Sequence, residues 1–115
     1  MKNTVSIKQN HVFRRLYSKG KSAVSPCLAV YCRKNRGGGN RLGLTVGSKL
    51  GKAGVRNRTR RRIREAYRIH EGRFVLGYDI VVVARVKAAF APYREIERSL
   101  LRAMDRLGLL KKEEL

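Results

Sequence analysis

The stretch VRNRTRRRIRE, residues 55–65, constrains the fold of this chain most, because it places six arginines in eleven residues ahead of a single carboxylate. Such a segment is either a disordered basic tail or one face of a folded element that meets a polyanion. The chain carries 28 Lys and Arg against 8 Asp and Glu, a net charge of +20, yet 43% of its 115 residues are hydrophobic. That content is too high for a disordered tail, so we expect a single folded RNA-binding domain over residues 1–115.

The positive charge also predicts the partner. A compact chain of this charge density repels itself unless counter-ions or a polyanion are normally present, so nucleic acid is the expected ligand. Apolar stretches such as residues 80–84 are far too short to cross a bilayer, and residues 1–13 lack the apolar core of a secretion signal. We therefore expect a cytoplasmic protein with no membrane contact.

Helical and strand periodicity divide the rest of the chain. Residues 10–20 predict a first helix with Asn10 as its N-cap and Gly20 as its stop. Its apolar side chains form two neighbouring stripes, Val12 with Leu16 and Phe13 with Tyr17. Residues 25–33 alternate as a strand does, with Leu28, Val30 and Cys32 on one side and Cys27, Ala29 and Tyr31 on the other. Because Cys27 and Cys32 would face opposite sides, we expect free thiols and neither a disulfide nor a metal clamp.

A second and a third strand flank the arginine-rich segment. In residues 41–47 the buried side would carry Leu42, Leu44 and Val46, and the other side would carry the small residues Gly43, Thr45 and Gly47. Small residues there leave room for something to approach the backbone. Residues 77–85 are apolar enough for a central strand, and Pro92 begins a last helix that ends before Gly108. The residues predict an α+β fold in which one helix, two or three strands, a helix, a strand and a helix follow one another, and we adopt the three-strand order αβββαβα.

Residues 55–71 form an amphipathic helix on a wheel advancing about 100° per residue. One side carries Val55, Thr59, Ile63, Ala66 and His70, and the opposite side carries Asn57, Arg60, Arg61, Arg64 and Arg68. Arg62 projects near the middle of the apolar side, so it must reach out to solvent or lie where that side passes the edge of the sheet. Arginine can fork two donors onto phosphate and can stack on bases, so this face predicts contact with RNA or DNA.

The segment GKAGVRNRTRRRIREAYR resembles the Arg-Asn-Arg signature region of the bacterial ribonuclease P protein subunit. The agreement extends over nearly the whole chain. VFRRLYSKG is similar to that family's first helix, LAVYCRK to its first long strand, RLGLTVGSKLGKA to the strand and loop before the signature, and YDIVVVAR to the strand after it. The resemblance implies a small α/β sandwich of ribosomal-protein-like fold, with a left-handed βαβ crossover around the arginine-rich helix, where general rules would favour a right-handed one.

The family's function is the removal of the 5′ leader from precursor tRNA by a ribonucleoprotein endonuclease. The resemblance implies that the RNA subunit is the catalyst, that Mg²⁺ ions are bound mainly by that RNA and the substrate, and that the protein holds no metal tightly. It implies a particle of one RNA and one protein, with dimerisation left open, and no DNA partner. The residues agree, since His11, His70, Asp79 and Asp105 are isolated in sequence, and we expect no catalytic residue in the protein.

Site residues follow by matching positions to the family. The helix positions placed against the RNA subunit and near the cleavage site are Arg56, Asn57, Arg58, Arg60, Arg61, Arg64 and Arg68. Phe13, Tyr17 and Tyr31 resemble aromatic positions in a cleft for the single-stranded leader, with Tyr17 replacing the family's Phe. Ser48, Lys49 and Lys52 resemble loop contacts to phosphate.

Each assignment has a structural alternative. Phe13 and Tyr17 could be ordinary core residues, the loop residues could be merely solvated, and Asn57 could bond backbone as readily as a nucleotide or a metal-bound water. A ribosomal or other structural RNA-binding protein would explain the charge equally well, but it does not call for the aromatic stripe. A DNA-binding regulator would need a helix-turn-helix, which the strands on both sides of the basic helix argue against.

Overall fold

A five-stranded mixed sheet organises residues 1–112, the part of the chain that the computed structural model describes. The strands are β1 (Thr4–Ser6), β2 (Lys21–Val24), β3 (Leu28–Lys34), β4 (Asn40–Thr45) and β5 (Tyr78–Ala84). The helices are α1 (Asn10–Lys19), α2 (Ala53–His70) and α3 (Tyr93–Arg106), joined in places by the short 3-10 turns η1 (Ser48–Leu50), η2 (Glu71–Arg73) and η3 (Val86–Ala89).

The strand order is β1-β4-β5-β3-β2, so the apolar strand β5 is central, as its sequence predicted. It pairs parallel with β4 and antiparallel with β3. The chain leaves β4, passes through α2 and returns as β5, which confirms the βαβ crossover around the arginine-rich helix.

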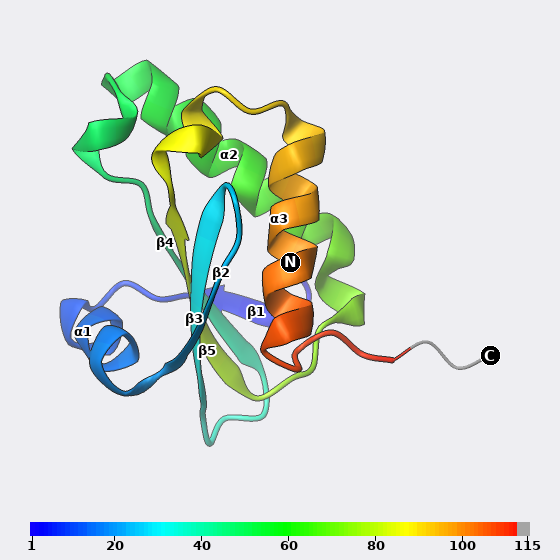
Figure 1. Cartoon of the computed structure of the whole chain (residues 1–115). Coiled ribbons are helices and arrows are strands. Elements are labelled where there is room, and N and C mark those ends of the chain that lie inside the picture. Colours follow the sequence, from blue (N-terminus) through cyan, green and yellow to red (C-terminus); the bar gives the residue numbers. More distant parts are fainter. Residues whose placement is uncertain (113–115) are drawn as a thin grey trace.

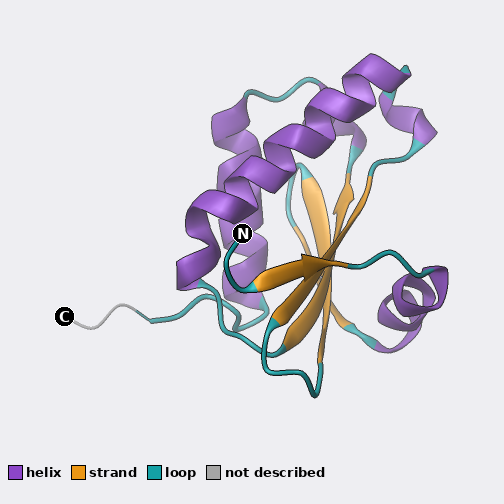
Figure 2. Cartoon of the chain, turned by 180° about the vertical axis from the view of Figure 1, so that it is seen from behind, coloured by secondary structure: helices purple, strands orange, loops and turns teal. Residues whose placement is uncertain are grey.

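The helices cover both faces of this sheet. Helix α1 packs on β3 and β5 from one side, whereas α2 and α3 pack on each other and on the opposite side (Figure 1). The view from behind shows the same separation, with α1 standing apart from the two longer helices (Figure 2). The α+β sandwich predicted for this chain is thus confirmed.

Two apolar clusters correspond to the two faces. The larger lies under α2 and α3 and contains Tyr67, Phe74, Ile80 and Leu100, each with no exposed surface. The smaller lies under α1, where Val12 and Leu16 meet Val81 of the central strand. Alternation along β5 therefore supplies both cores, because successive side chains of a strand point to opposite faces.

Strand β1 was absent from the predicted order. It is three residues long and its one apolar residue, Val5, is exposed, so it is too short to show a periodic pattern, and it is held by its tertiary partners. It pairs parallel with β4, and the backbone N–H groups of Lys2 and Asn3 donate to the Glu71 carboxylate at 2.8 and 3.3 Å. Burial alone would raise the pKa of Glu71, but the Thr4 hydroxyl and these N–H groups lower it.

The ends of α1 differ from the predicted cap. Gln9, not Asn10, is the N-cap, and Asn10 is the first helical residue. Gly20 does end the helix, but with a φ of −77°, outside the left-handed region. A Cβ at Gly20 would lie 2.5 Å from the carbonyl oxygen of Leu16, so glycine is needed for close packing rather than for its backbone angle.

The two cysteines are both free, as predicted, and both are buried, but their predicted orientation was wrong. Cys27 precedes β3 and lies in the same large cluster as Cys32, so strand alternation does not separate them. Burial raises the pKa of the Cys32 thiol, with Lys21 opposing the shift, which keeps this thiol protonated and unreactive.

Candidate nucleic-acid interface

Helix α2 presents its arginines because its other side is fully used in the core. The buried residues on that side, each at most 1% exposed, are Thr59, Ile63, Ala66 and Tyr67. The Thr59 hydroxyl donates a hydrogen bond to the Val55 carbonyl oxygen at 2.9 Å. This confirms the predicted wheel for Thr59, Ile63 and Ala66. The opposite side of α2 must then face solvent, and we call its exposed residues Asn57, Arg58, Arg61, Arg64 and Arg68, with the half-buried Arg60, the arginine face.

Several of these side chains already have protein partners. Arg60 donates to the Oδ1 of Asn57 at 2.9 Å, and Arg68 forks onto both oxygens of Glu65 at 2.6 and 3.0 Å. The hydrogen bonds from Arg68 lower the pKa of the Glu65 carboxyl. Within residues 1–112, Arg61 and Arg64 have no such partner, so their guanidinium groups are the least committed on this face.

Arg62, together with Arg58 of the arginine face, holds a neighbouring turn. Arg62 donates to the carbonyl oxygen of Ala91 at 3.1 Å, and Arg58 donates to that of Ala89 at 3.4 Å. The Arg62 side chain is half-buried where α2 packs against the segment between η3 and α3. This contact explains why Arg62 projects from the apolar side of the helix. Its role is to fasten that link. Arg56 is also half-buried, and its Nε is shielded from solvent without a protein acceptor among the described residues.

A groove runs between α1 and the end of β4, on the other side of the sheet from α2 and α3. It measures about 610 Å³ and is lined by Asn10, Phe13, Arg14, Tyr17, Leu44, Thr45 and Val46. The Tyr17 hydroxyl bonds the Thr45 hydroxyl at 2.7 Å, and the Tyr17 ring, 40% exposed, forms part of the wall. We call this the aromatic groove.

Two of the three predicted aromatic residues line the groove, and the third packs behind one of them. Phe13 and Tyr17 line the groove, whereas Tyr31 is absent from its lining. Tyr31 meets Tyr17 edge to face, with ring centroids 5.0 Å apart and an interplanar angle of 79°, so it sets the orientation of Tyr17. Phe13 and Tyr31 also pack against the smaller core, which means that core packing and groove lining are not exclusive here.

The small face of β4 is what admits the Phe13 ring. A Cβ placed on Gly43 would come within 2.6 and 2.7 Å of the Cζ and Cε1 of Phe13. Only glycine permits that approach, so the predicted room beside the β4 backbone is filled by a protein side chain. The ring is thereby fixed at the floor of the groove.

Sequence reasoning missed two polar groove residues, Asn10 and Arg14. Together with Phe13 and Tyr17 they occupy one face of α1 at the i, i+3, i+4 and i+7 spacing, and that spacing could have identified them. Arg14 places a cation beside the aromatic rings, which suits a ligand that carries both bases and phosphates.

The loop from β4 to α2 joins the groove to the arginine face. Ser48, Lys49 and Lys52 are all exposed there, whereas Leu50 between them is 6% exposed and anchors the turn in the large core. Gly51 has a φ of 136°, which residues other than glycine rarely adopt. We call the segment with Ser48, Lys49 and Lys52 the basic loop. In chain order it follows Val46, the last groove residue, and precedes the N-terminus of α2.

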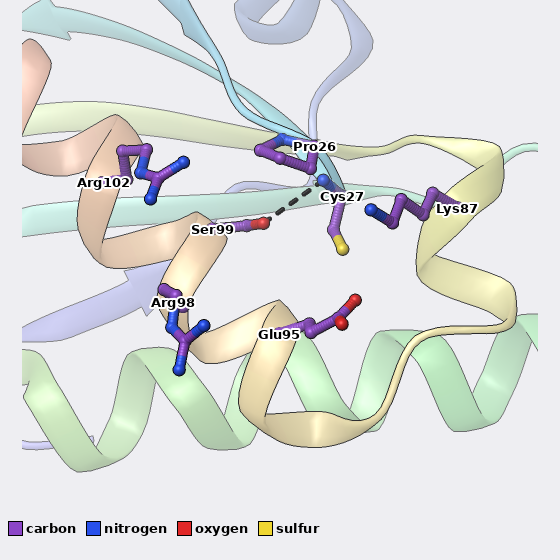
Figure 3. A pocket seen from close by; sticks show the side chains of 7 residues that line it. All are labelled: Pro26, Cys27, Lys87, Glu95, Arg98, Ser99 and Arg102. Atoms are coloured by element: carbon purple, nitrogen blue, oxygen red, sulfur yellow. Dashed lines mark hydrogen bonds between the residues drawn. The ribbon is translucent and has the colours of Figure 1, made fainter.

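A separate pocket of about 190 Å³ lies between α3, η3 and the start of β3 (Figure 3). Its lining consists of Pro26, Cys27, Lys87, Glu95, Arg98, Ser99 and Arg102. The Cys27 N–H donates to the Ser99 hydroxyl at 3.2 Å. No imidazole lines this pocket to activate the thiol or the hydroxyl, so it lacks a nucleophile paired with a histidine base.

Two of the titratable residues that the sequence singled out, His70 and Asp79, have structural partners. His70 lies 2.9 Å from the Glu97 carboxylate and links α2 to α3. Asp79 receives two hydrogen bonds from Arg41, at 2.7 and 2.6 Å, across the β4–β5 pair. Among residues 1–112, no three His, Cys, Asp or Glu side chains lie close enough together to hold a metal ion. The described helices include none that is both long and apolar enough to cross a membrane.

Comparisons with known proteins agree with this geometry. The family model described as Ribonuclease P matches residues 1–108. The Ribonuclease P protein component of Alkaliphilus metalliredigens is 36% identical over 110 residues, covering 96% of this chain and 99% of the relative. That of Clostridioides difficile is 39% identical over 107 residues, covering 92% and 94%.

Solved structures give the same result. The Staphylococcus aureus RNase P protein superposes with a TM-score of 0.84 at 34% identity, over 92% of this chain and 97% of that one. The Thermotoga maritima protein superposes with a TM-score of 0.77 at 32% identity, over 84% and 92%.

Proposed function

The chain belongs to the ribonuclease P protein family, and from that membership we propose that it is the protein subunit of a ribonuclease P that removes the 5′ leader of precursor tRNA. In this proposal the chain binds the RNA subunit and the leader together. The observation that carries it is the order of three features along the chain, because the groove ends at Val46, the basic loop follows it, and the arginine-rich helix α2 begins directly after that loop.

The groove is suited to the leader. Aromatic faces stack on any base, at about 1–3 kcal/mol per base, so they bind a strand whose sequence varies. Phe13 is fixed against Gly43 and Tyr17 is held by Thr45 and Tyr31, so both rings are already oriented before RNA arrives. Arg14 at the same wall supplies a contact for phosphate.

The arginine face is suited to the RNA subunit. Arg61 and Arg64 are exposed and uncommitted in the described part of the chain, and Arg60 and Arg68 need only exchange a surface partner for phosphate. Exposed ion pairs such as that of Arg68 are weak, so the exchange is nearly free of cost. Lys49 and Lys52 would hold phosphates where the leader leaves the groove.

We assign no catalytic step to this chain. The proposal gives hydrolysis to the RNA subunit, with Mg²⁺ bound by that RNA and by the substrate, since no cluster of metal-ligating side chains occurs in residues 1–112. The protein acts by binding the leader and by neutralising phosphates, which lets the two RNAs approach. We further propose a particle of one RNA and one protein, located in the cytoplasm.

Cleavage tests the proposal directly. A 5′-labelled precursor tRNA is incubated at low Mg²⁺ with a bacterial ribonuclease P RNA alone, with this protein alone, and with both. We expect cutting at the mature 5′ end only in the combination. Cutting by the protein alone would overturn the assignment of catalysis to RNA, and no effect of the protein with several RNA subunits would indicate a structural RNA-binding protein instead.

Leader length separates groove binding from general attraction to polyanions. We expect the affinity of the reconstituted particle to rise over the first few leader nucleotides and then to level off. Phe13→Ala and Tyr17→Ala should flatten this rise, whereas Lys111→Ala, an exposed cation at the other end of the chain, should leave it unchanged. Equal affinity for precursor and mature tRNA would contradict a leader site.

A further inference from the structure

Phe90 has the most exposed large hydrophobic side chain in residues 1–112, at 82% of its surface. Single exposed apolar residues are common on proteins, so exposure alone is weak evidence for a binding site. Phe90 differs because its neighbours on both sides are buried: Ala88, Ala89 and Ala91 are 1%, 4% and 5% exposed. The ring therefore projects from a segment that is packed into the core.

The backbone around Phe90 is held on both sides. Its own N–H donates to the Lys87 carbonyl at 3.1 Å, as does the N–H of Ala91 at 3.0 Å. The carbonyls of Ala89 and Ala91 accept the guanidinium groups of Arg58 and Arg62. Two arginines of α2 thus hold the peptide on either side of the ring, and the ring position is set by the helix.

Cations belong both to the turn that precedes the ring and to the helix that holds this segment. Lys87, in the same turn, is exposed, and Arg58 is exposed at the start of α2. Figure 1 shows the turn η3, in yellow, beside the first half of α2. A nucleotide offers an anionic phosphate and a flat base, and this place offers guanidinium groups and a flat apolar ring.

We propose that Phe90 is a stacking platform for one unpaired base of the RNA subunit, with Lys87 and the arginine face holding the adjoining phosphates. The inference rests on the proposed function. The RNA subunit is the occupant because the residues on either side of Phe90 are bonded to α2, which carries the arginine face. Helix α1, the wall of the aromatic groove, lies on the other side of the sheet (Figure 2).

Substitutions of the ring test this without disturbing the fold, because an exposed side chain contributes little to stability. We expect Phe90→Ala to weaken binding to the RNA subunit by about 5- to 150-fold, the range that loss of one stacked base implies. Phe90→Leu should weaken it nearly as much, since leucine is apolar but has no flat face. Val86→Ala is the matched control, because Val86 is apolar, 50% exposed and in the same turn, and it should bind normally.

Phe90→Trp provides a direct readout. The chain has no tryptophan, so the new indole would be the only one, and it should keep wild-type affinity. We expect its emission to be quenched when the RNA subunit binds and shielded from acrylamide, to the same extent with short and long leaders. Unchanged emission on binding, or wild-type affinity of Phe90→Ala, would overturn the inference.

The two proposals fail separately. If the wild-type protein does not bind a ribonuclease P RNA, the proposed function fails. If wild type binds and Phe90→Ala binds equally well, only the stacking platform fails. A loss confined to leader-dependent affinity, with binding to the RNA subunit intact, would assign the base to the substrate and also overturn the inference.

Discussion

Arg61 and Arg62 are adjacent in α2, carry the same charge and should have opposite roles. Arg62 donates to the Ala91 carbonyl from a half-buried position, whereas Arg61 is exposed and has no partner in the described part of the chain. Arg62→Ala should therefore lower stability, and Arg61→Ala should lower affinity for RNA. Both variants lose one positive charge, so any gain from reduced self-repulsion is common to the two and cancels in their difference.

The size of the stability effect follows from the bond that is lost. A hydrogen bond from a charged donor contributes about 1.5–3 kcal/mol, and the partial exposure of Arg62 favours the lower end. A chain of 115 residues has an unfolding entropy of about 0.24 kcal/mol/K, so about 1.5 kcal/mol corresponds to a fall in Tm of about 6 °C. Arg61→Ala should leave Tm within about 2 °C of the wild-type value.

The RNA effect is measured on the same two proteins. If Arg61 neutralises one phosphate, its removal should reduce the slope of log K against log salt by about 0.7–0.9, while Arg62→Ala should bind with the wild-type slope under conditions where it is folded. Thermal melts and binding to a ribonuclease P RNA from low to moderate salt provide both numbers. Equal losses of Tm, or a reduced slope only in Arg62→Ala, would refute the division of roles.

Three further predictions concern the sheet and the groove. Burial would raise the pKa of Asp79, but hydrogen bonds from Arg41 and Asn35 and the charges of Arg41 and Arg33 hold it below its usual value. The ionised Asp79 carboxylate therefore contributes its full stabilisation above about pH 4, and this stabilisation is lost as the pH falls through the lower folded-state pKa. Below about pH 4, the urea midpoint of Asp79→Asn should accordingly depend less on pH than that of wild type. Tyr17→Phe should keep leader affinity within about two-fold, because only the bond to Thr45 is lost. Tyr17→Ala should lose about 5- to 150-fold in titrations with leader-bearing precursor tRNA, and equal losses in the two variants would show that the hydroxyl, not the ring, is what binds. Gly43→Ala should cost about 1–3 kcal/mol by displacing the Phe13 ring, and a denaturation midpoint equal to wild type would mean that the ring can move freely.

The arginine-rich helix shows how far local pattern carries. Thr59, Ile63 and Ala66 recur at helical spacing, so the buried side of α2 and its exposed arginine face were both predicted. The purpose of Arg62 was not, because its acceptor is the carbonyl of Ala91, 29 residues away in the chain. A wheel shows which way a side chain points, but not what it meets.

The aromatic groove also shows that local sequence pattern does not reveal which distant residues meet. The Phe13 and Tyr17 stripe and the small face of β4 were both visible in the sequence, but their meeting depends on α1 packing across the sheet. Tyr31 does not line the groove but packs edge to face on Tyr17 beside it, because β3 lies on the far side of the central strand from β4. The RNA contacts themselves remain predictions.

What the sequence determined by itself was what repeats locally or depends on composition: the basic partner, the helices, the long strands and the motif of the family. What only the tertiary structure decided was each pairing between distant segments. Strand β1 exists because β4 and the Glu71 carboxylate accept it, Arg62 is structural because α3 begins beside it, and Phe90 is exposed because its neighbours are held in the core. Such contacts leave no periodic trace, since each joins residues that the chain separates by tens of positions.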